Sequence, residues 1–435
     1  MHGTFIMKIE RRSVLRAGGA VLLAAAPLSL LLNRRGQTEP AKTPASAGPH
    51  ALGGIERDPN RLLDLRAGFT YTVVERFGDA MSDGHRVPGL ADGMACFPGP
   101  DGTLVLMRNH EVERQAAFAA YRGKAPAHAY DPNAYGGVTR VVVDARTGER
   151  RSSNLVLAGT LRNCAGGPSP WGWLSCEEHV DPGHGYVFLC RTDATKLAPA
   201  ERIPAYGRFN HEAVCIDPKT LGAYLTEDRV DGCLYRMVPT DRARPFEGHL
   251  EALAVRGSPR LDTGRRLEPG RRYPVEWIRI PDPDPKDDSV RHQALELGAA
   301  IVRRGEGIWY HDGSVYIAAT IGGPRGTGQI LRLHLGDRPE LEEYARSEDP
   351  AALDYPDNIT VAPWGDLYLA EDGAGEQYVR VITTKGKLLD LARNARSSGE
   401  LAGVCFSPDG TLLFVNLYNE GITVAIRGPF RELAA

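Results

Sequence analysis

The chain has 435 residues, a formal net charge of -3 and a sequence pI of about 6.5. This charge balance, with no clustered stripe of Lys and Arg between aromatic residues, excludes the strongly basic field that nucleic-acid binding needs. The length exceeds the usual limit for a single hydrophobic core. Repeat architectures escape that limit by adding modules, so the length does not force two domains.

The N-terminal segment has the pattern of an export signal. Glu10-Arg11-Arg12-Ser13-Val14-Leu15-Arg16 carries paired arginines, and an apolar run from Ala17 to Leu32 follows it. This run is short for a membrane span and is typical of a twin-arginine (Tat) signal. We therefore expect residues 1–47 to be a Tat signal peptide and linker, with Ala45-Ser46-Ala47 as the cleavage site, and the protein to be periplasmic or extracellular.

A short N-terminal anchor helix is the alternative to a cleaved signal. Asn33-Arg34-Arg35 directly after the apolar run is unusual for a cleavable signal, and an anchored form would stay on the membrane. Nothing later in the sequence has the pattern of a membrane span. Residues 48–435 are expected to form one domain, and its partners are expected to be the Tat machinery and a small-molecule substrate.

A short apolar strand, preceded by a turn and followed by acids or amides, recurs along the chain. The copies are residues 102–109, 173–178, 221–228, 313–320, 365–372 and 410–416. They lie mostly about 45 to 65 residues apart, which fits four-stranded blades. We therefore predict an all-β, six-bladed β-propeller with loop insertions and a metal site in its central funnel, where residues such as Asn109, Glu178, Glu227 and Asp372 converge. A closed propeller leaves few open strand edges, so we expect a monomer.

One gap between copies is longer, about 90 residues, and indicates an insertion. It contains Pro-Asp-Pro-Asp-Pro-Lys-Asp-Asp at 281–288, and these prolines and charges exclude a core strand. We interpret this segment as an exposed loop, with a calcium-binding loop as the alternative. The residues from Val290 to Val302 are compatible with a short helix.

The segment from Asn163 to Glu178 sets a thiol among small residues ahead of paired carboxylates. Cys164 has little side-chain bulk around it, so its sulfur can approach an ion. A buried strand then delivers Glu177 and Glu178. A thiolate favours iron or another transition ion, whereas carboxylates and amide oxygens suit hard cations, so the mixture implies more than one metal. Taken alone, this segment also fits a buried structural cysteine followed by solvated acids.

The seven cysteines are an odd number for an exported protein. At least one of them therefore has no intramolecular partner, which is consistent with Cys164 serving a metal. The pairing of the other six cannot be deduced from their spacing.

Six further motifs accompany the cysteine loop in a fixed order. They are Arg108-Asn109-His110-Glu111, Gly207-Arg208-Phe209-Asn210-His211-Glu212-Ala213, Arg304-Gly305-Glu306-Gly307, Pro356-Asp357-Asn358-Ile359, Glu371-Asp372-Gly373 and the segment from Glu400 to Gly410. With these motifs the chain resembles the PhoX family of exported alkaline phosphatases from about Asp92 to Pro429. It is shorter than the larger phosphatases of that family, and Arg162 stands beside its cysteine loop.

The resemblance implies a site that combines iron and calcium. Cys164, Glu212 and Glu306 are the expected iron ligands. The residues expected on the calcium side are Asn109, Glu177, Glu178, Asp357, Glu371 and Asp372. The implied reaction is hydrolysis of a small phosphate ester by in-line attack of a metal-held oxide or hydroxide.

Arg304 is the residue expected to take a catalytic part. It lies two residues before Glu306, and in an extended segment that spacing points both side chains to the same side. The guanidinium would clamp the phosphate and stabilise developing charge. An ordinary ion pair with a structural carboxylate is the alternative.

Other polar residues are less specific. His110 and His211 each precede a glutamate that faces the opposite side of a strand, so a structural role is favoured for both histidines. Glu227-Asp228 ends a strand and either joins the site or faces water.

Two rival functions remain from other classes. One is a calcium-dependent lactonase-like propeller, which Pro356-Asp357-Asn358-Ile359 also resembles, and the other is a non-catalytic periplasmic binding propeller. Cys164 discriminates against the first, because a calcium-only site has no use for a thiolate.

Overall fold

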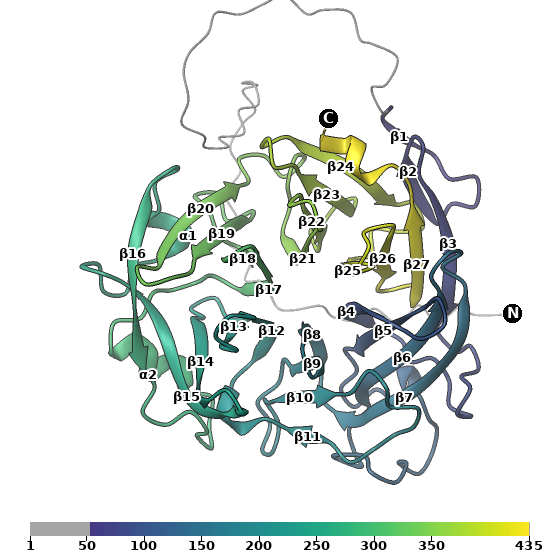
Figure 1. Cartoon of the computed structure of the whole chain (residues 1–435), viewed down its shortest axis with the longest axis horizontal. Coiled ribbons are helices and arrows are strands. Elements are labelled where there is room, and N and C mark those ends of the chain that lie inside the picture. The colour runs from purple at the N-terminus through teal and green to yellow at the C-terminus, as the bar shows by residue number, and fades with distance from the viewer. Residues whose placement is uncertain (1–52, 435) are drawn as a thin grey trace, which may run out of the picture.

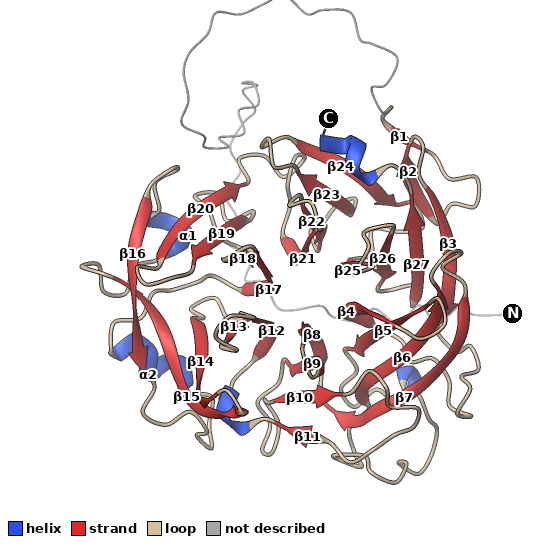
Figure 2. Cartoon of the chain, viewed as in Figure 1, coloured by secondary structure: helices blue, strands red, loops and turns tan. Residues whose placement is uncertain are grey.

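The computed structural model describes residues 53–434, and these residues form an all-β fold with a propeller-like arrangement. Figure 1 shows the sheets following one another around a common axis in chain order, and Figure 2 shows that strands surround that axis while helices lie at the periphery. The predicted all-β, propeller-like class is therefore confirmed. The expected Tat signal and its cleavage site, residues 1–47, lie outside the described residues.

The strands form five hydrogen-bonded sheets. Three of them have four strands: β4 (Ala91–Pro98), β5 (Thr103–His110), β6 (Gly136–Asp144) and β7 (Arg150–Thr160); β8 (Asn163–Ser169), β9 (Gly172–Glu177), β10 (Val187–Cys190) and β11 (Glu201–Arg202); and β25 (Leu401–Phe406), β26 (Leu412–Leu417), β27 (Ile422–Arg427) and β3 (Thr70–Arg76). The six-stranded sheet contains β21 (Pro356–Val361), β22 (Leu367–Glu371), β23 (Tyr378–Ile382), β24 (Leu388–Asn394), β2 (Leu63–Arg66) and β1 (Ile55–Glu56).

The fifth sheet has nine strands because one strand bridges two antiparallel runs. The first run is β12 (His211–Ile216), β13 (Ala223–Glu227), β14 (Leu234–Asp241) and β15 (Arg244–Val255), and the second is β17 (Gly305–His311), β18 (Ser314–Ala319), β19 (Gln329–His334) and β20 (Glu340–Arg346). Strand β16 (Arg272–Arg279) pairs with both β15 and β20. The helices α1 (Thr263–Arg266) and α2 (Val290–Glu296) flank it in sequence, and α2 confirms part of the helix predicted after residue 289.

Six strands line the axis: β4, β8, β12, β17, β21 and β25. Each packs against the next, and β25 packs against β4, which closes the ring. The strand repeat found in the sequence corresponds to β5, β9, β13, β18, β22 and β26. Each of these strands pairs with the inner strand that comes just before it in the chain. It is therefore the second strand from the axis.

Neighbouring sheets bury each other's faces, so the second strands are apolar on both sides. In β5, Leu106 packs with Phe414 of β26, whereas the next residue, Met107, packs with Phe188 of β10. All four side chains are almost completely buried. Because successive side chains of a strand point to opposite faces, continuous apolar runs are needed wherever both faces are covered.

The N-terminal end of the described chain closes the ring. Strand β3 pairs with β27, and β2 pairs with β24. The carboxylate of Glu75 in β3 is bound by Arg108 of β5 and by Arg150 of β7, at 2.9 Å from Nη1 of Arg150. Arg108 also donates to the hydroxyl groups of Thr423 and Thr139. This buried ion pair ties the last sheet of the chain to the β4–β7 sheet.

All seven cysteines lie in the described part of the chain, and all are free thiols. Among residues 53–434, no helix has the length and apolar character needed to cross a membrane.

The closure makes a prediction for stability. Arg108→Met leaves the buried carboxylate of Glu75 with only Arg150, so the free energy of unfolding should fall by about 3 kcal/mol, the usual cost of removing one partner from a buried ion pair. Urea unfolding at neutral pH measures this change. Arg191→Met, at an exposed ion pair with Glu201, is the matched control and should leave the midpoint almost unchanged. Equal midpoints for both variants would contradict the proposed role of the pair.

Candidate metal centre

The innermost strands share a local irregularity that creates the site. In each of them the pairing with the second strand is interrupted near the start of the strand. The residues at the first interrupted position are Asp92, Cys164, Glu212, Glu306 and Asp357 in β4, β8, β12, β17 and β21. Such bulges re-aim a side chain, and here they turn thiol and carboxylate groups from five inner strands toward the axis.

A small residue follows four of these five, and Asn358 follows Asp357. In β4 it is Gly93, where an added Cβ would lie 2.5 Å from Cα of Ala165 on the next inner strand. In β17 it is Gly307, where an added Cβ would lie 2.6 Å from the carbonyl oxygen of Asp357. Real Cβ atoms do not approach that closely. The small residues therefore let neighbouring inner strands come together and hold the preceding side chains in one layer.

Two further sets of equivalent positions contribute. The residue directly after each second strand donates its backbone N–H to the carbonyl of the residue directly before the inner strand, as Glu111 does to Leu90 at 2.9 Å and Asp372 does to Tyr355 at 3.0 Å. The corresponding pairs elsewhere are Glu178 with Arg162, Asp228 with Asn210, Thr320 with Arg304, and Tyr418 with Glu400. These hydrogen bonds place the donor residues and the acceptor residues beside the side chains that the bulges turn toward the axis.

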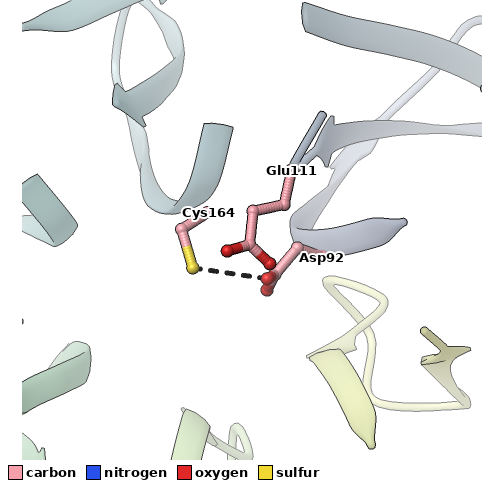
Figure 3. Close-up of side chains that lie close together, drawn as sticks. All are labelled: Asp92, Glu111 and Cys164. Carbon is pink, nitrogen blue, oxygen red and sulfur yellow. Dashed lines mark hydrogen bonds between the residues drawn. The ribbon is translucent and has the colours of Figure 1, made fainter. Parts of the chain in front are cut away.

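Four overlapping groups of ligand-type side chains result. In each group the ligand atoms all lie within 4.8 Å of one another. The groups are Asp92, Glu111 and Cys164; Cys164, Glu178 and Glu212; Glu212, Glu306 and Asp357; and Asp357, Asp372 and Glu400. We call these nine residues the acid–thiol cluster. Figure 3 shows the first group, with Cys164 and Asp92 joined by a hydrogen bond.

Burial makes this cluster unfavourable without cations. Both carboxylate oxygens of Glu212 are buried and accept no hydrogen bond from any described residue. Burial, together with the neighbouring carboxylates of Glu306 and Glu178, raises the pKa of Glu212 well above its ordinary value. The pKa values of Asp92 and Glu400 are raised well above their ordinary values by burial and by nearby acids in the same way. Bound cations would reverse this penalty, so the donor set fits them.

The thiol belongs to this arrangement rather than to an apolar core. Sγ of Cys164 lies 3.3 Å from Oδ2 of Asp92, to which it donates. Burial and the charge of Asp92 raise the pKa of Cys164 well above its ordinary value. Thiolates bind transition ions in preference to calcium, so a metal with affinity for sulfur suits this corner of the cluster.

Two arginines border the cluster. Arg304 donates from Nε and Nη2 to the carboxylate of Asp228, at 2.7 and 3.1 Å, and from Nη2 to Oε1 of Glu306 at 2.7 Å. Arg162 donates from Nη2 to Oε1 of Glu111 at 2.6 Å and approaches Oε2 of Glu178 at 2.7 Å. Both guanidinium groups are only partly buried, so they lie where the cluster meets solvent.

Beyond the cluster, further along the inner strands, the space on the axis is small. A cavity of only about 20 Å³ remains there, and its lining includes Met94, Ile308, Ile359 and Val404. A space of this size holds about one water molecule. This part of the axis is therefore too small for a phosphate ester.

The model of the family described as alkaline phosphatase PhoX matches residues 51–156 and 146–421, which is most of the chain. The chain belongs to this family. It is accordingly a PhoX-like alkaline phosphatase, a phosphoric ester hydrolase. The resemblance inferred from the seven motifs is thereby confirmed.

Similar solved structures include Pseudomonas fluorescens PhoX in complex with vanadate, a transition state analogue. It is 17% identical, with a TM-score of 0.66 over 87% of this chain and 98% of that chain. At this identity the likeness shows the fold. A gluconolactonase from Xanthomonas campestris is 15% identical, with a TM-score of 0.40 over 88% of this chain and 99% of that chain. Among curated proteins no match was found.

Six of the residues predicted as metal ligands lie together in this PhoX-family chain. They are Cys164, Glu178, Glu212, Glu306, Asp357 and Asp372. Arg304, the predicted phosphate clamp, contacts one of them, Glu306.

Glu177 and Glu371 lie outside the cluster because they are the last residues of β9 and β22 and point to the opposite side from Glu178 and Asp372. Glu177 accepts from the backbone N–H of Leu161 and lies 2.6 Å from Nδ1 of His184. Glu371 accepts from Nε of Arg380 at 2.9 Å.

Asn109 of β5 lies two residues before Glu111 and is not a member of the cluster. It connects β5 to the neighbouring sheet. Its Nδ2 donates to the carbonyl of Ala165 at 2.6 Å, and its Oδ1 accepts from Nε1 of Trp173 and the hydroxyl group of Ser175. Nδ2 of Asn416 makes the same kind of contact to the carbonyl of Asp92. Asn109 therefore braces the inner strand that carries Cys164.

Three residues of the cluster were not among the predicted ligands: Asp92, Glu111 and Glu400. Asp92-Gly93-Met94 repeats the pattern of Glu306-Gly307-Ile308, an acid followed by a small and then an apolar residue, so an internal comparison of the motifs would have found Asp92. Glu111 and Glu400 lie inside recognised motifs. Glu111 could have been recognised as the residue directly after a second strand, β5, and Glu400 as the residue directly before an inner strand, β25.

The remaining polar motifs have partners outside the cluster. The rings of His110 and His211 are buried, burial lowers both pKa values, and each ring contacts a backbone carbonyl. In the loop at 281–288, Asp284 accepts from the hydroxyl group of Tyr186, and Asp288 pairs with Arg229 and Arg291. No ligand-type group of the described residues includes this loop.

Glu227 is a buried acid outside the cluster, and its contribution to stability can be measured. It is fully buried in β13, accepts from the hydroxyl group of Tyr235, and burial raises its pKa from 4.5 to about 7. The unfolded chain therefore releases this proton first as the pH rises. The contribution of Glu227 to stability is complete below pH 4.5 and is lost as the pH rises to about 7.

We accordingly predict that Glu227→Gln flattens the dependence of stability on pH. Between pH 4.5 and 8, the free energy of unfolding of the natural chain should fall by about 3 kcal/mol relative to the variant. Urea unfolding at several pH values measures the difference, with the exposed Glu201→Gln as control. Parallel curves for the natural chain and Glu227→Gln would refute the assignment.

Proposed function

We propose that the acid–thiol cluster binds iron and calcium ions and that small phosphate esters are hydrolysed there. The observation that carries this proposal is the burial of Glu212, whose carboxylate oxygens both accept no hydrogen bond from a described residue, next to a thiol and further acids. Hydrogen bonds or charge partners normally compensate a buried carboxylate, and cations are the partner that this surrounding lacks. The iron side would comprise Cys164, Glu212 and Glu306.

The ligands of the calcium side differ in part from those expected from the sequence. Glu178, Asp357 and Asp372 remain in the proposed set, and Asp92, Glu111 and Glu400 join them on the basis of their distances. These six carboxylates are oxygen ligands of the kind that calcium takes.

We further propose that the fold is a six-bladed propeller whose funnel holds this centre. The ring of six inner strands and the six equivalent hydrogen bonds beside it support this count. In this interpretation β16 is an insertion that joins two four-stranded blades into the nine-stranded sheet. Residues 48–435 would then form a single domain.

When bound, the cations would supply Lewis-acid activation of the phosphoryl group and an activated oxygen nucleophile. The chain's own residues orient the ester. Asp228 and Glu306 hold Nε and Nη2 of Arg304, whereas Nη1 makes no hydrogen bond to a described residue. Nη1 is thus the edge of Arg304 that can donate to a phosphoryl oxygen and stabilise the charge that develops on it.

The first test measures metals and activity together. The protein, purified without chelators, should contain iron and calcium by elemental analysis and should hydrolyse p-nitrophenyl phosphate. Cys164→Ala should lose iron and at least about 100-fold of the activity, because a thiolate ligand of the transition ion is removed. Cys190→Ala, a buried thiol of β10 remote from the cluster, is the matched control and should retain both.

Calcium alone, with hydrolysis of a lactone and no phosphatase activity, would overturn the proposal in favour of a lactonase-like enzyme. Calcium alone, without hydrolysis of any ester, would indicate a binding propeller.

We also propose that the Tat pathway exports the chain and that it works as a monomer in the periplasm or outside the cell. Arg11 and Arg12 carry the export proposal. The double variant Arg11→Lys/Arg12→Lys should remain in the cytoplasmic fraction at full length. Export of that variant at the natural level, seen by fractionation and immunoblotting, would refute the Tat assignment.

A further inference from the structure

Arg162 and Arg304 occupy equivalent positions in the fold. Each precedes an inner strand by one residue, β8 or β17. Each carbonyl accepts a hydrogen bond from the residue that follows the second strand of its own sheet, Glu178 at 2.9 Å and Thr320 at 3.0 Å. Each also has a left-handed backbone, with φ of 49° and 47°. The two guanidinium groups therefore leave the ring of inner strands from corresponding points.

The backbone of Arg162 is held in a conformation that an arginine rarely adopts. Its N–H donates to the carbonyl of Val112 at 3.1 Å, and its carbonyl accepts from Glu178. A non-glycine residue in the left-handed region costs roughly 1–2 kcal/mol, and such strain concentrates at functional sites. A long cationic side chain at this position therefore requires a functional explanation.

The guanidinium of Arg162 is anchored on two residues of the cluster. It contacts the carboxylates of Glu111 and Glu178, whose side chains are 10% and 3% exposed, whereas its own side chain is 23% exposed. A carboxylate oxygen of Glu178 lies within 4.8 Å of one of Glu212. The same holds for Glu306, the cluster residue that Arg304 contacts. Glu212 thus lies between the acids that the two arginines contact.

We propose that Arg162 is a second phosphate-binding residue, which contacts the phosphoryl oxygens of the substrate together with Arg304. This inference rests on the proposed function. A guanidinium matches the spacing of two phosphate oxygens, and two of them select a dianion with several oxygens over a neutral ester. Their positive charge also offsets the repulsion that the carboxylates of Glu111 and Glu178 would exert on an anionic substrate.

The test uses the metal-loaded, full-length protein and inorganic phosphate as the probe. Isothermal titration calorimetry compares the natural chain with Arg162→Gln, Arg162→Lys and the control Arg114→Gln. The side chain of Arg114 is 49% exposed and pairs with Asp131 and Asp181, neither of which belongs to the cluster. Elemental analysis and the KM and kcat for p-nitrophenyl phosphate are measured on the same preparations.

Arg162→Gln should weaken phosphate binding by about 10- to 100-fold, the loss expected for a charge-assisted hydrogen bond. The KM should rise with it, and the metal content should stay that of the natural chain. Arg162→Lys should recover part of the affinity, and Arg114→Gln should bind phosphate normally.

Three results would overturn the inference. One is unchanged phosphate affinity in Arg162→Gln. Another is an altered metal content in that variant, since Arg162 would then balance the charge of Glu111 and Glu178 in place of a cation. The third is a natural chain that binds no phosphate. Phosphate binding that depends on Arg162, in a protein without phosphatase activity, would support this inference while refuting the proposed function.

Discussion

Repulsion among buried acids is the constraint on which the rest of the structure depends. Glu212 is buried beside other carboxylates and accepts no hydrogen bond from residues 53–434, so its ionised form is unfavourable until cations bind. A flexible chain would relieve such repulsion by moving the side chains apart. Here the ring of inner strands prevents this, because Gly93 and Gly307 bring neighbouring strands so close that each acid is fixed in place.

The closed ring also explains how ligands from distant parts of the chain meet. Each sheet contributes through the same three backbone positions, so one local geometry, repeated around the axis, assembles Asp92, Cys164 and Asp357 in one layer. The buried pair of Glu75 and Arg108 completes the ring where the chain ends meet. Stability and site geometry therefore depend on the same contacts, and a loosened closure should disturb the cluster before it unfolds the protein.

Much of this arrangement follows from the sequence, because turns, apolar strands and acidic strand ends repeat at regular spacing. That pattern led to the propeller-like fold, the loop of small residues led to Cys164, and the resemblance of the motifs to the PhoX family led to Glu212 and Glu306. It could not assign each member of an acidic pair: Glu177 and Glu178 are equivalent in composition, and only the end of β9 decides which one faces the axis. Nor could it locate Asn109, whose place one pleat from the cluster depends on contacts with the next sheet. Arg162 looked like a departure from the family until its equivalence to Arg304 was visible in three dimensions.

The most direct measurement is anomalous X-ray scattering at the iron edge, on crystals of the protein purified from its exported form. The account predicts a strong anomalous peak within bonding distance of Sγ of Cys164 and of the carboxylate of Glu212, with weaker calcium density on the side of Asp372 and Glu400. An axis without anomalous density, in which Cys164 still donates to Asp92, would contradict it.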